Sequence, residues 1–225
     1  VAADQAARAA TAGWTGPGAT ADGVRVQLLA NVADAASARS AARMPVEGVG
    51  LFRTELCFLN RAEEPSVEEQ AEIYSEVLSA FGGAHHVVVR TLDAGSDKPV
   101  AFATHAGEEN RIGFEGKVAA DAPRWRGLDV SNLFTPGSQN PVRGLRLAFE
   151  NPGLLDRQLD AIALAAARTG TPTWVMAPMV ATVAETADFT ERVRSRGLTA
   201  GVMVEIPSAA LLAHRFLEVV DFLSL

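Results

Sequence analysis

Short apolar segments alternate with longer helical segments along most of this chain. Each apolar segment is rich in β-branched residues and bounded by turn residues, as is typical of a strand buried in a parallel sheet. Two of the helical segments open with capping boxes, Ser66-x-x-Glu69 and Thr182-x-x-Glu185. This alternation predicts a parallel sheet covered by helices. The expected strands are residues 24–32, 48–53, 87–90, 174–179, 201–205 and 220–225, and the expected helices are 33–43, 66–81, about 140–169 with a break near 151–153, 183–196 and 208–217.

Two architectures satisfy this alternation: an open doubly wound sheet and a (β/α)8 barrel. The barrel is favoured because charged residues end several successive strands, no glycine-rich phosphate loop follows the first strand, and the units recur at regular spacing. A complete barrel has eight strands and typically about 250 residues, whereas this chain of 225 residues reaches a sixth strand. The expected fold is therefore α/β: an incomplete (β/α)8 TIM-type barrel of about six of the eight βα units.

Two segments interrupt the alternation. Residues 1–23 join an alanine-rich stretch to a Gly/Ala/Thr-rich one, which indicates the end of a linker helix followed by a linker. Residues 111–139 carry Gly, Pro, Trp and mixed charge without a clear period, which predicts a long insertion after the third strand. A partial barrel would thus occupy residues 24–225. Because such a barrel exposes a strand edge, we expect the insertion, another chain or an exchanged element to cover it.

The composition disfavours several classes of function. A net charge of −7 argues against a nucleic-acid surface, and no apolar run approaches the length of a membrane span. No signal peptide is expected, and a single cysteine excludes an internal disulfide, which fits a cytoplasmic location. That cysteine, Cys57, is expected to be a small buried apolar residue rather than a nucleophile. The four histidines lack a metal-binding spacing.

Two arginines lie at the carboxyl ends of neighbouring apolar segments. Arg53 ends Val-Gly-Leu-Phe-Arg, and Arg90 ends Val-Val-Val-Arg. Ligands of α/β barrels bind at this end of the strands, and guanidinium groups bind phosphate or carboxylate through paired hydrogen bonds. The repetition favours an anion site over the alternative, structural ion pairs with Glu55 and Asp93. Lys98, beyond a Gly-Ser turn, would add a positive charge to such a site.

Three further charged residues are candidates for the same site. Glu205 follows an apolar segment and precedes Pro207, so its carboxylate is expected at the barrel mouth. It could serve there as a counter-ion to the arginines or as an oxygen ligand of Mg²⁺, and the pattern alone does not separate the two. Arg143 and Arg146 begin a helical segment, where a solvated helix face is the ordinary interpretation.

These strings together resemble the phosphoenolpyruvate-binding barrel of Enzyme I, the phosphoenolpyruvate–protein phosphotransferase of the bacterial sugar phosphotransferase system. The resemblance covers about residues 24–225, apart from the irregular segment. Pyruvate phosphate dikinase and phosphoenolpyruvate synthase share the barrel, but the strings are closer to Enzyme I. The matching strings are Glu-Gly-Val-Gly-Leu-Phe-Arg53-Thr-Glu55, Glu-Glu-Gln70, Val-Arg90-Thr-Leu-Asp93-x-Gly-x-Asp97-Lys98, Arg143-Gly-Leu-Arg146, Ala-Pro178-Met179-Val, Gly-Val-Met-Val-Glu205-x-Pro207 and Val-Asp221-Phe-Leu-Ser.

The resemblance implies a function and roles for these residues. Arg53 and Arg90 would hold the phosphate of phosphoenolpyruvate, with Arg143 assisting, and Glu205 would be one of two protein ligands of Mg²⁺. The reaction implied is phosphoryl transfer from phosphoenolpyruvate to a histidine on another domain, the first step of sugar uptake by this system. A small histidine-containing phosphocarrier protein would then accept the group, and the enzyme could form a homodimer.

Several parts of the family's machinery are expected to lie outside this chain. These are the second Mg²⁺ ligand, a substrate-binding asparagine, the proton-donating cysteine and the acceptor histidine, so no catalytic residue is expected here and the chain alone is expected to be inactive. The stretch between Asn110 and Pro141 also departs from the family. Three alternatives remain open: a non-catalytic phosphoenolpyruvate-binding or dimerisation module, a dikinase-like relative, and a lyase or aldolase. The last needs a second carboxylate at the mouth, and Asp221 begins its strand instead.

Overall fold

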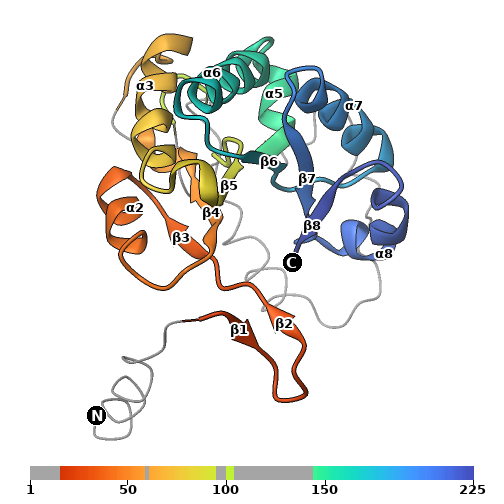
Figure 1. The fold of residues 1–225 in the computed structure, drawn as a ribbon. Coiled ribbons are helices and arrows are strands. Elements are labelled where there is room, and N and C mark those ends of the chain that lie inside the picture. Colours follow the sequence, from red (N-terminus) through yellow and green to blue (C-terminus); the bar gives the residue numbers. More distant parts are fainter. Residues whose placement is uncertain (1–15, 59–60, 95–99, 104–143) are drawn as a thin grey trace, which may run out of the picture.

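A six-stranded parallel sheet is the central feature of the computed structural model, which describes residues 16–58, 61–94, 100–103 and 144–225. The strands follow one another in chain order, and the sheet curls with the helices on its outer face (Figure 1). This arrangement confirms the predicted incomplete TIM-type barrel. The strands are β3 (Ala30–Val32), β4 (Gly48–Arg53), β5 (His86–Arg90), β6 (Thr173–Ala177), β7 (Thr199–Met203) and β8 (Phe222–Ser224).

Two helices begin at the caps that the sequence indicates. The side chains of Ser66 and Thr182 accept hydrogen bonds from the backbone of Glu69 and Glu185, completing both predicted capping boxes. The expected break after residue 150 is present, with Gly153 at a φ of 82°. The helices are α2 (Ala35–Ala41), α3 (Val67–Leu78), α5 (Leu147–Glu150), α6 (Leu154–Thr169), α7 (Val183–Arg194) and α8 (Pro207–Phe216), with 3-10 turns at Thr54–Cys57, Gly82–Ala84 and Gly144–Arg146.

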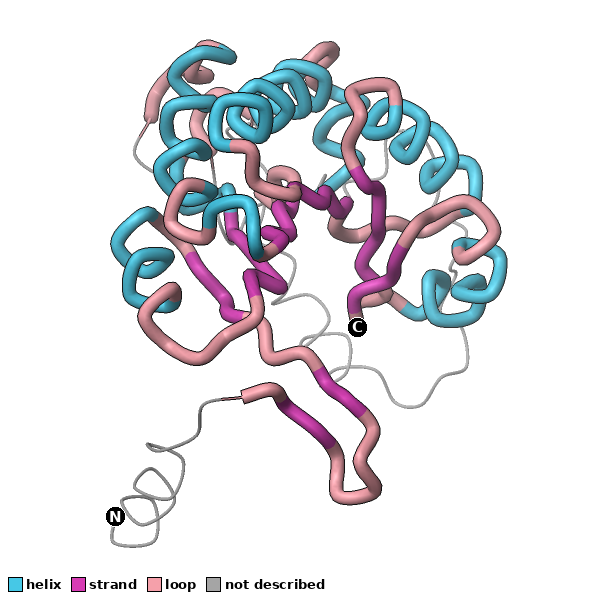
Figure 2. Tube along the Cα trace, viewed as in Figure 1, coloured by secondary structure: helices cyan, strands magenta, loops and turns pink. Residues whose placement is uncertain are grey.

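The predicted first strand, residues 24–32, is wrong in its first half. Its Arg25–Val26 portion forms β2, which pairs antiparallel with β1 (Gly18–Ala19) in a hairpin projecting from the barrel (Figure 2). Gly23 lies in the hairpin turn at a φ of 88°, a conformation in which glycine avoids a steric penalty. The predicted strand 201–205 also ends early, at Met203, which places Glu205 in a loop. The predicted helix end before residue 16 and the insertion at 111–139 lie outside the described residues.

The two faces of the curled sheet have different surroundings. Val87 and Val89 of β5 and Val175 of β6 are fully buried in the main hydrophobic core, as is Phe52 of β4, whose ring packs edge-on against Tyr74 of α3 at 5.9 Å. Burying one such side chain stabilises the fold by roughly 1.5–3 kcal/mol. These residues therefore point outward to the helices, and the alternate residues of the same strands point into the barrel.

An aromatic layer lies on the inner face, near the amino ends of the strands. The rings of His86 and Trp174 stack at 4.2 Å, and Trp174 contacts Phe222 of β8 at 5.2 Å. The Phe222 ring covers Gly201 of β7, because a Cβ at that glycine would lie 2.4 Å from it. This end of the barrel interior is thus occupied by side chains, while the carboxyl ends of the strands carry the charged candidates.

Stability is expected to depend on pH through His86. Burial lowers the pKa of His86 below its ordinary value of 6.5, and the neighbouring His85 lowers it further. As pH falls through 6.5, the unfolded chain takes up this proton before the folded chain does, so the folded state loses stability below that pH. Urea unfolding from pH 8 to pH 5 should show wild type losing stability relative to His86→Phe below pH 6.5 and a constant difference above about pH 7. Parallel curves over the whole range would contradict this.

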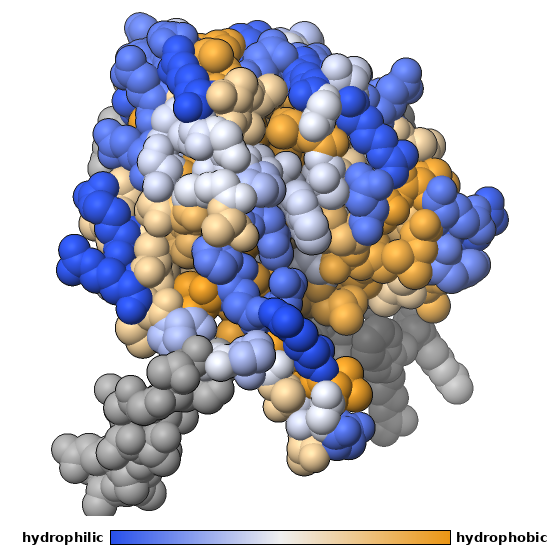
Figure 3. Space-filling view, viewed as in Figure 1, coloured by the Kyte–Doolittle hydropathy of each residue, from blue (hydrophilic) through white to orange (hydrophobic). Residues whose placement is uncertain are grey.

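The edges of the sheet are β3 and β8, which lie on opposite sides of its opening (Figure 1). Apolar surface gathers over α8 and β8 (Figure 3), where Leu211, Leu217 and Leu225 are exposed. The predicted cover for this opening stays a prediction, because the insertion lies outside the described residues. Among the described helices, none combines the length and the hydropathy needed to cross a membrane.

Candidate functional site

Arg53 and Arg90 lie side by side at the carboxyl ends of β4 and β5. They are direct partners in the parallel register of the two strands, and adjacent strands lie about 4.8 Å apart. Both occupy positions on the inner face, because the preceding residues, Phe52 and Val89, are buried outward. The structure thus brings together the two arginines that the sequence singled out.

A bulge in β4 produces this alignment. Val49 pairs with Val87 and Phe52 with Val89, so three steps along β4 match two steps along β5. The register with β3 shifts at the same place, where Ala30 pairs with Val49 and Asn31 with Leu51, leaving Gly50 as the extra residue. A bulge of this kind redirects every side chain that follows it. Strict alternation from Val49 would instead have pointed Arg53 outward.

Arg90 is held by buried carboxylates. Its Nη2 lies 2.6 Å from Glu55 Oε1 and 3.3 Å from Asp93 Oδ2, and the Arg90 side chain is 8% exposed. Its Nη1 lies 3.9 Å from Sδ of Met203, on β7, which places the guanidinium inside the barrel. Its buried Nε has no hydrogen-bond partner among the described residues. The predicted alternative, an ion pair with Asp93, therefore also exists, and Arg90 has a structural role whatever it binds.

Arg53 differs from Arg90 in both burial and pairing. Its side chain is exposed and forms no ion pair or hydrogen bond with the residues that the structure describes. The expected alternative partner, Glu55, pairs with Arg90 instead. One guanidinium is therefore fixed in a buried network, and its neighbour at the barrel mouth has no polar partner within the described part of the chain. Phosphate and carboxylate are the anions that suit such a pair.

Glu205 lies in the loop between β7 and α8, with its side chain exposed. Its Oε1 accepts a hydrogen bond of 2.7 Å from the backbone N–H of Met179, which follows β6 and has a φ of 56°. Glu205 forms no ion pair with any described arginine, so the counter-ion interpretation finds no support within the described residues. Its carboxylate steadies the strained loop after β6, and its second oxygen has no described hydrogen-bond partner.

The other predicted site residues are less informative. Lys98 and Arg143 lie outside the described residues. Arg146 is partly exposed, with Nε 3.9 Å from Glu185 Oε1, which is consistent with a helix-surface residue. Asp221 lies at the amino end of β8, where it accepts a hydrogen bond from the Ala200 N–H, and its pairing with Arg194 lowers its pKa. As expected, Asp221 lies at the end of its strand that is opposite the barrel mouth.

A metal site cannot be assembled from described side chains alone. No group of three or more His, Cys, Asp or Glu residues suited to a metal ion occurs among the described residues. Glu205 offers a single carboxylate at the mouth, and Mg²⁺ is commonly held by one or two carboxylates together with substrate oxygens and water.

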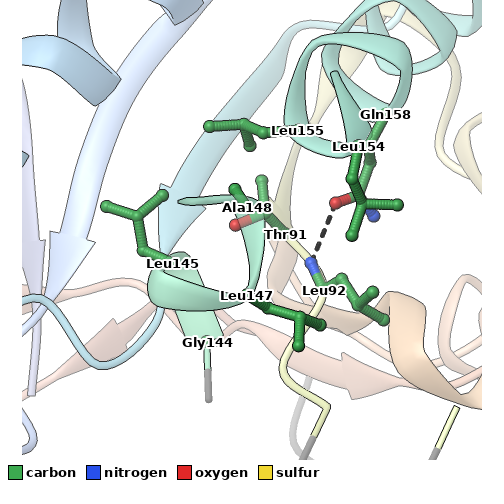
Figure 4. A pocket seen from close by; sticks show the side chains of 9 residues that line it. All are labelled: Thr91, Leu92, Gly144, Leu145, Leu147, Ala148, Leu154, Leu155 and Gln158. Carbon is green, nitrogen blue, oxygen red and sulfur yellow. Dashed lines mark hydrogen bonds between the residues drawn. The ribbon is translucent and has the colours of Figure 1, made fainter. Parts of the chain in front are cut away.

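Sequence reasoning missed a set of buried polar residues behind the arginines. Thr54, Tyr74 and Gln158 are each at most 3% exposed, and the Gln158 amide donates a hydrogen bond to each of the other two hydroxyls. A lone glutamine on the apolar face of a helix has no sequence signature, although Gln70 of the same network did belong to a matching string. Gln158 also lines a cavity of about 10 Å³ between β5, α5 and α6 (Figure 4), which is far too small for a substrate.

Cys57 is expected to react slowly. It is half-buried, and burial, followed by the nearby Glu55 carboxylate, raises the pKa of its thiol from 9.0 to about 12. This difference makes the thiolate about a thousandfold scarcer than at an ordinary cysteine, and the thiolate is the reactive form. Alkylation by iodoacetamide at pH 8 should thus be at least about a hundredfold slower than in the same chain unfolded in urea. Equal rates would refute the assignment of Cys57 as a structural residue.

The sequence of this chain is similar to that of known proteins. The family described as PEP-utilising enzyme, PEP-binding domain, where PEP is phosphoenolpyruvate, matches residues 8–225. The chain is 45% identical to a phosphoenolpyruvate-protein phosphotransferase of Streptomyces coelicolor, over 97% of this chain and 35% of that protein. It is 36% identical to a protein of the same name from Haloferax volcanii, over 92% of this chain and 34% of that protein.

A third relative has a different name. The chain is 34% identical to a multiphosphoryl transfer protein of Rhodobacter capsulatus, over 93% of this chain and 22% of that protein. The chain spans about a third of the length of the two phosphotransferases above, at 35% and 34%. Since the family match extends over most of its residues, the chain belongs to the PEP-binding domain family of PEP-utilising enzymes.

Proposed function

We propose that this chain is the substrate-binding part of a PEP-dependent protein phosphotransferase. The observation that supports this most directly is the pairing of Arg53 and Arg90, in register at the carboxyl ends of β4 and β5. Two relatives, 45% and 36% identical to this chain, carry that enzyme's name. In the proposed activity, PEP donates its phosphoryl group to a histidine outside this chain, in the cytoplasm, as the first step of sugar uptake.

The two arginines would have different roles in binding PEP. Arg90, fixed by Glu55 and Asp93, presents a pre-positioned guanidinium, which lowers the entropic cost of binding. Arg53, exposed beside it, would close on the phosphate from the mouth. Together they would neutralise charge on the phosphoryl oxygens as the bond to the leaving enolate breaks. Lys98 and Arg143 are proposed to contact the same substrate as further positively charged groups.

Mg²⁺ is the proposed cofactor, and Glu205 is the residue that would hold it. When bound, it would supply positive charge to the phosphoryl oxygens during transfer. Glu205 has one carboxylate oxygen on the Met179 N–H and presents an exposed side chain, which leaves the other oxygen for the ion. The proposed partners are the histidine-containing phosphocarrier protein, which would accept the phosphoryl group, and a second copy of the enzyme in a homodimer. No phosphoryl transfer to the carrier is expected from this chain alone.

Calorimetric titration tests this proposal on the chain itself. PEP should bind weakly, more tightly with Mg²⁺ than without it, and inorganic phosphate should compete. Glu205→Gln should remove the Mg²⁺ enhancement while retaining metal-independent binding, because it deletes the proposed ligand and keeps the loop contact. Absence of PEP binding at millimolar concentrations, or binding that phosphate does not displace, would overturn the proposed function.

A further inference from the structure

One glutamine side chain joins the ends of the two strands that carry the arginines. Gln158, on α6, is 3% exposed. Its Oε1 accepts a 2.9 Å hydrogen bond from the backbone N–H of Leu92, two residues beyond Arg90 (Figure 4). Its Nε2 donates a 3.1 Å hydrogen bond to Oγ1 of Thr54, the residue that follows Arg53. The same amide therefore contacts the chain directly beyond β4 and directly beyond β5.

In the hydrogen-bond network around Gln158, the order of donors and acceptors is fixed. The Thr54 hydroxyl donates a hydrogen bond to the Arg90 carbonyl oxygen at 2.8 Å. The second N–H of Gln158 is donated to the Tyr74 hydroxyl at 3.1 Å, which donates in turn to Gln70 Oε1 at 3.2 Å. Each hydroxyl accepts one hydrogen bond and donates another, so the amide cannot turn over without facing its NH₂ to the Leu92 N–H. The side chain is thus held in a single orientation.

Arg90 therefore lies between two anchors. On its side-chain side, Glu55 and Asp93 hold the guanidinium. On its backbone side, Thr54 binds the Arg90 carbonyl and Gln158 binds the amide two residues later. A leucine at position 158 would fill the core without these bonds, so packing alone does not explain a buried amide here. The bonds lie where a small backbone displacement would move the guanidinium.

We propose that Gln158 is a positioning residue of the arginine pair: through Thr54 and Leu92 it sets the spacing and orientation of the Arg53 and Arg90 guanidinium groups. This inference rests on the proposed function only for its effect on ligand binding. Its structural part, the dependence of Arg90 on Gln158, stands on the hydrogen bonds themselves.

The experiment compares three substitutions that each remove a buried hydrogen bond. Gln158→Met keeps the side-chain volume and deletes the amide, and Thr54→Val deletes the link to the Arg90 carbonyl. Thr171→Val is the matched control: Thr171 is 3% exposed and donates to the Leu78 carbonyl at 3.1 Å, but it precedes β6 at the amino end of the barrel. A general loss of core stability should therefore appear in all three variants.

The first readout needs no ligand. The ¹H–¹⁵N resonance of the buried Arg90 Nε, assigned by its absence in Arg90→Lys, should shift or broaden in Gln158→Met and Thr54→Val and stay in place in Thr171→Val. An unchanged Arg90 resonance in folded Gln158→Met refutes the proposal. If Gln158→Met does not fold, the same outcome in Thr54→Val refutes it, because Thr54 is the link between Gln158 and the Arg90 carbonyl.

The second readout is PEP affinity. Gln158→Met and Thr54→Val should weaken binding about tenfold, whereas Thr171→Val should leave it unchanged despite a similar fall in melting temperature. Equal affinity in all three variants would refute the link to binding. Failure of wild type to bind PEP would count against the proposed function, and the Arg90 resonance would still decide the structural role of Gln158.

Discussion

Arg90→Ala is expected to lower the free energy of unfolding by about 3–5 kcal/mol, because it leaves buried carboxylates without the cation that faces them. Glu55 is fully buried and Asp93 is 2% exposed, and both lie within ion-pair distance of the Arg90 guanidinium. Typical domains have only about 5–15 kcal/mol of stability in total, so this loss would be large. Urea unfolding followed by circular dichroism measures it.

Two companion variants separate the charge effect from lost packing. Arg90→Lys keeps a cation but not the guanidinium geometry and should recover part of the stability. Combining Arg90→Ala with Glu55→Gln should also recover part of it, since one buried charge is then removed. A loss below about 1 kcal/mol for Arg90→Ala, typical of an exposed ion pair, would contradict the buried arrangement described here.

Arg53→Ala is expected to do the reverse: it should abolish most PEP binding and leave stability nearly unchanged. Its side chain is exposed and makes no described polar contact, so the free energy of unfolding should change by less than about 0.5 kcal/mol. Hydrogen bonds to charged groups contribute about 1.5–3 kcal/mol, so PEP affinity should fall roughly 10- to 100-fold. Calorimetry gives the affinity, and urea unfolding gives the stability.

Arg43→Ala is the matched control for Arg53→Ala. Arg43 is also exposed, and it precedes β4 at the opposite end of the strand, so the substitution makes the same change in net charge away from the proposed site. Its PEP affinity should equal that of wild type. A comparable loss of affinity in both variants would show that general electrostatic attraction, and not a specific contact of Arg53, accounts for binding.

Much of the fold could be predicted because its signals are local. Apolar runs and capping boxes, such as those at Ser66 and Thr182, depend on neighbouring residues and translate directly into strands and helix starts. The hairpin at residues 18–26 escaped prediction because its strands have two residues each and only Gly18 among them is buried, so no apolar pattern separates them from the strand that follows.

The candidate site could be predicted only in part. The position of Arg53 and Arg90 at strand ends follows from sequence, and their presence at one edge follows from parallel topology. Which carboxylate pairs with which arginine does not follow, because Glu55 reaches the neighbouring strand instead of the nearby Arg53. Gln158 lies more than sixty positions from either strand end, and only the packing of α6 against the sheet brings it there.

The bulge at Gly50 takes up one residue that regular pairing could not place. Between Val49 and Phe52, β4 takes three steps while β5 takes two, from Val87 to Val89. Deleting Gly50 would therefore leave two steps against two, and Arg53 would still point into the barrel beside Arg90. Straightening the bulge without removing a residue would instead turn Arg53 toward the helix layer, so the backbone geometry and the residue count of β4 have to match for the two arginines to meet.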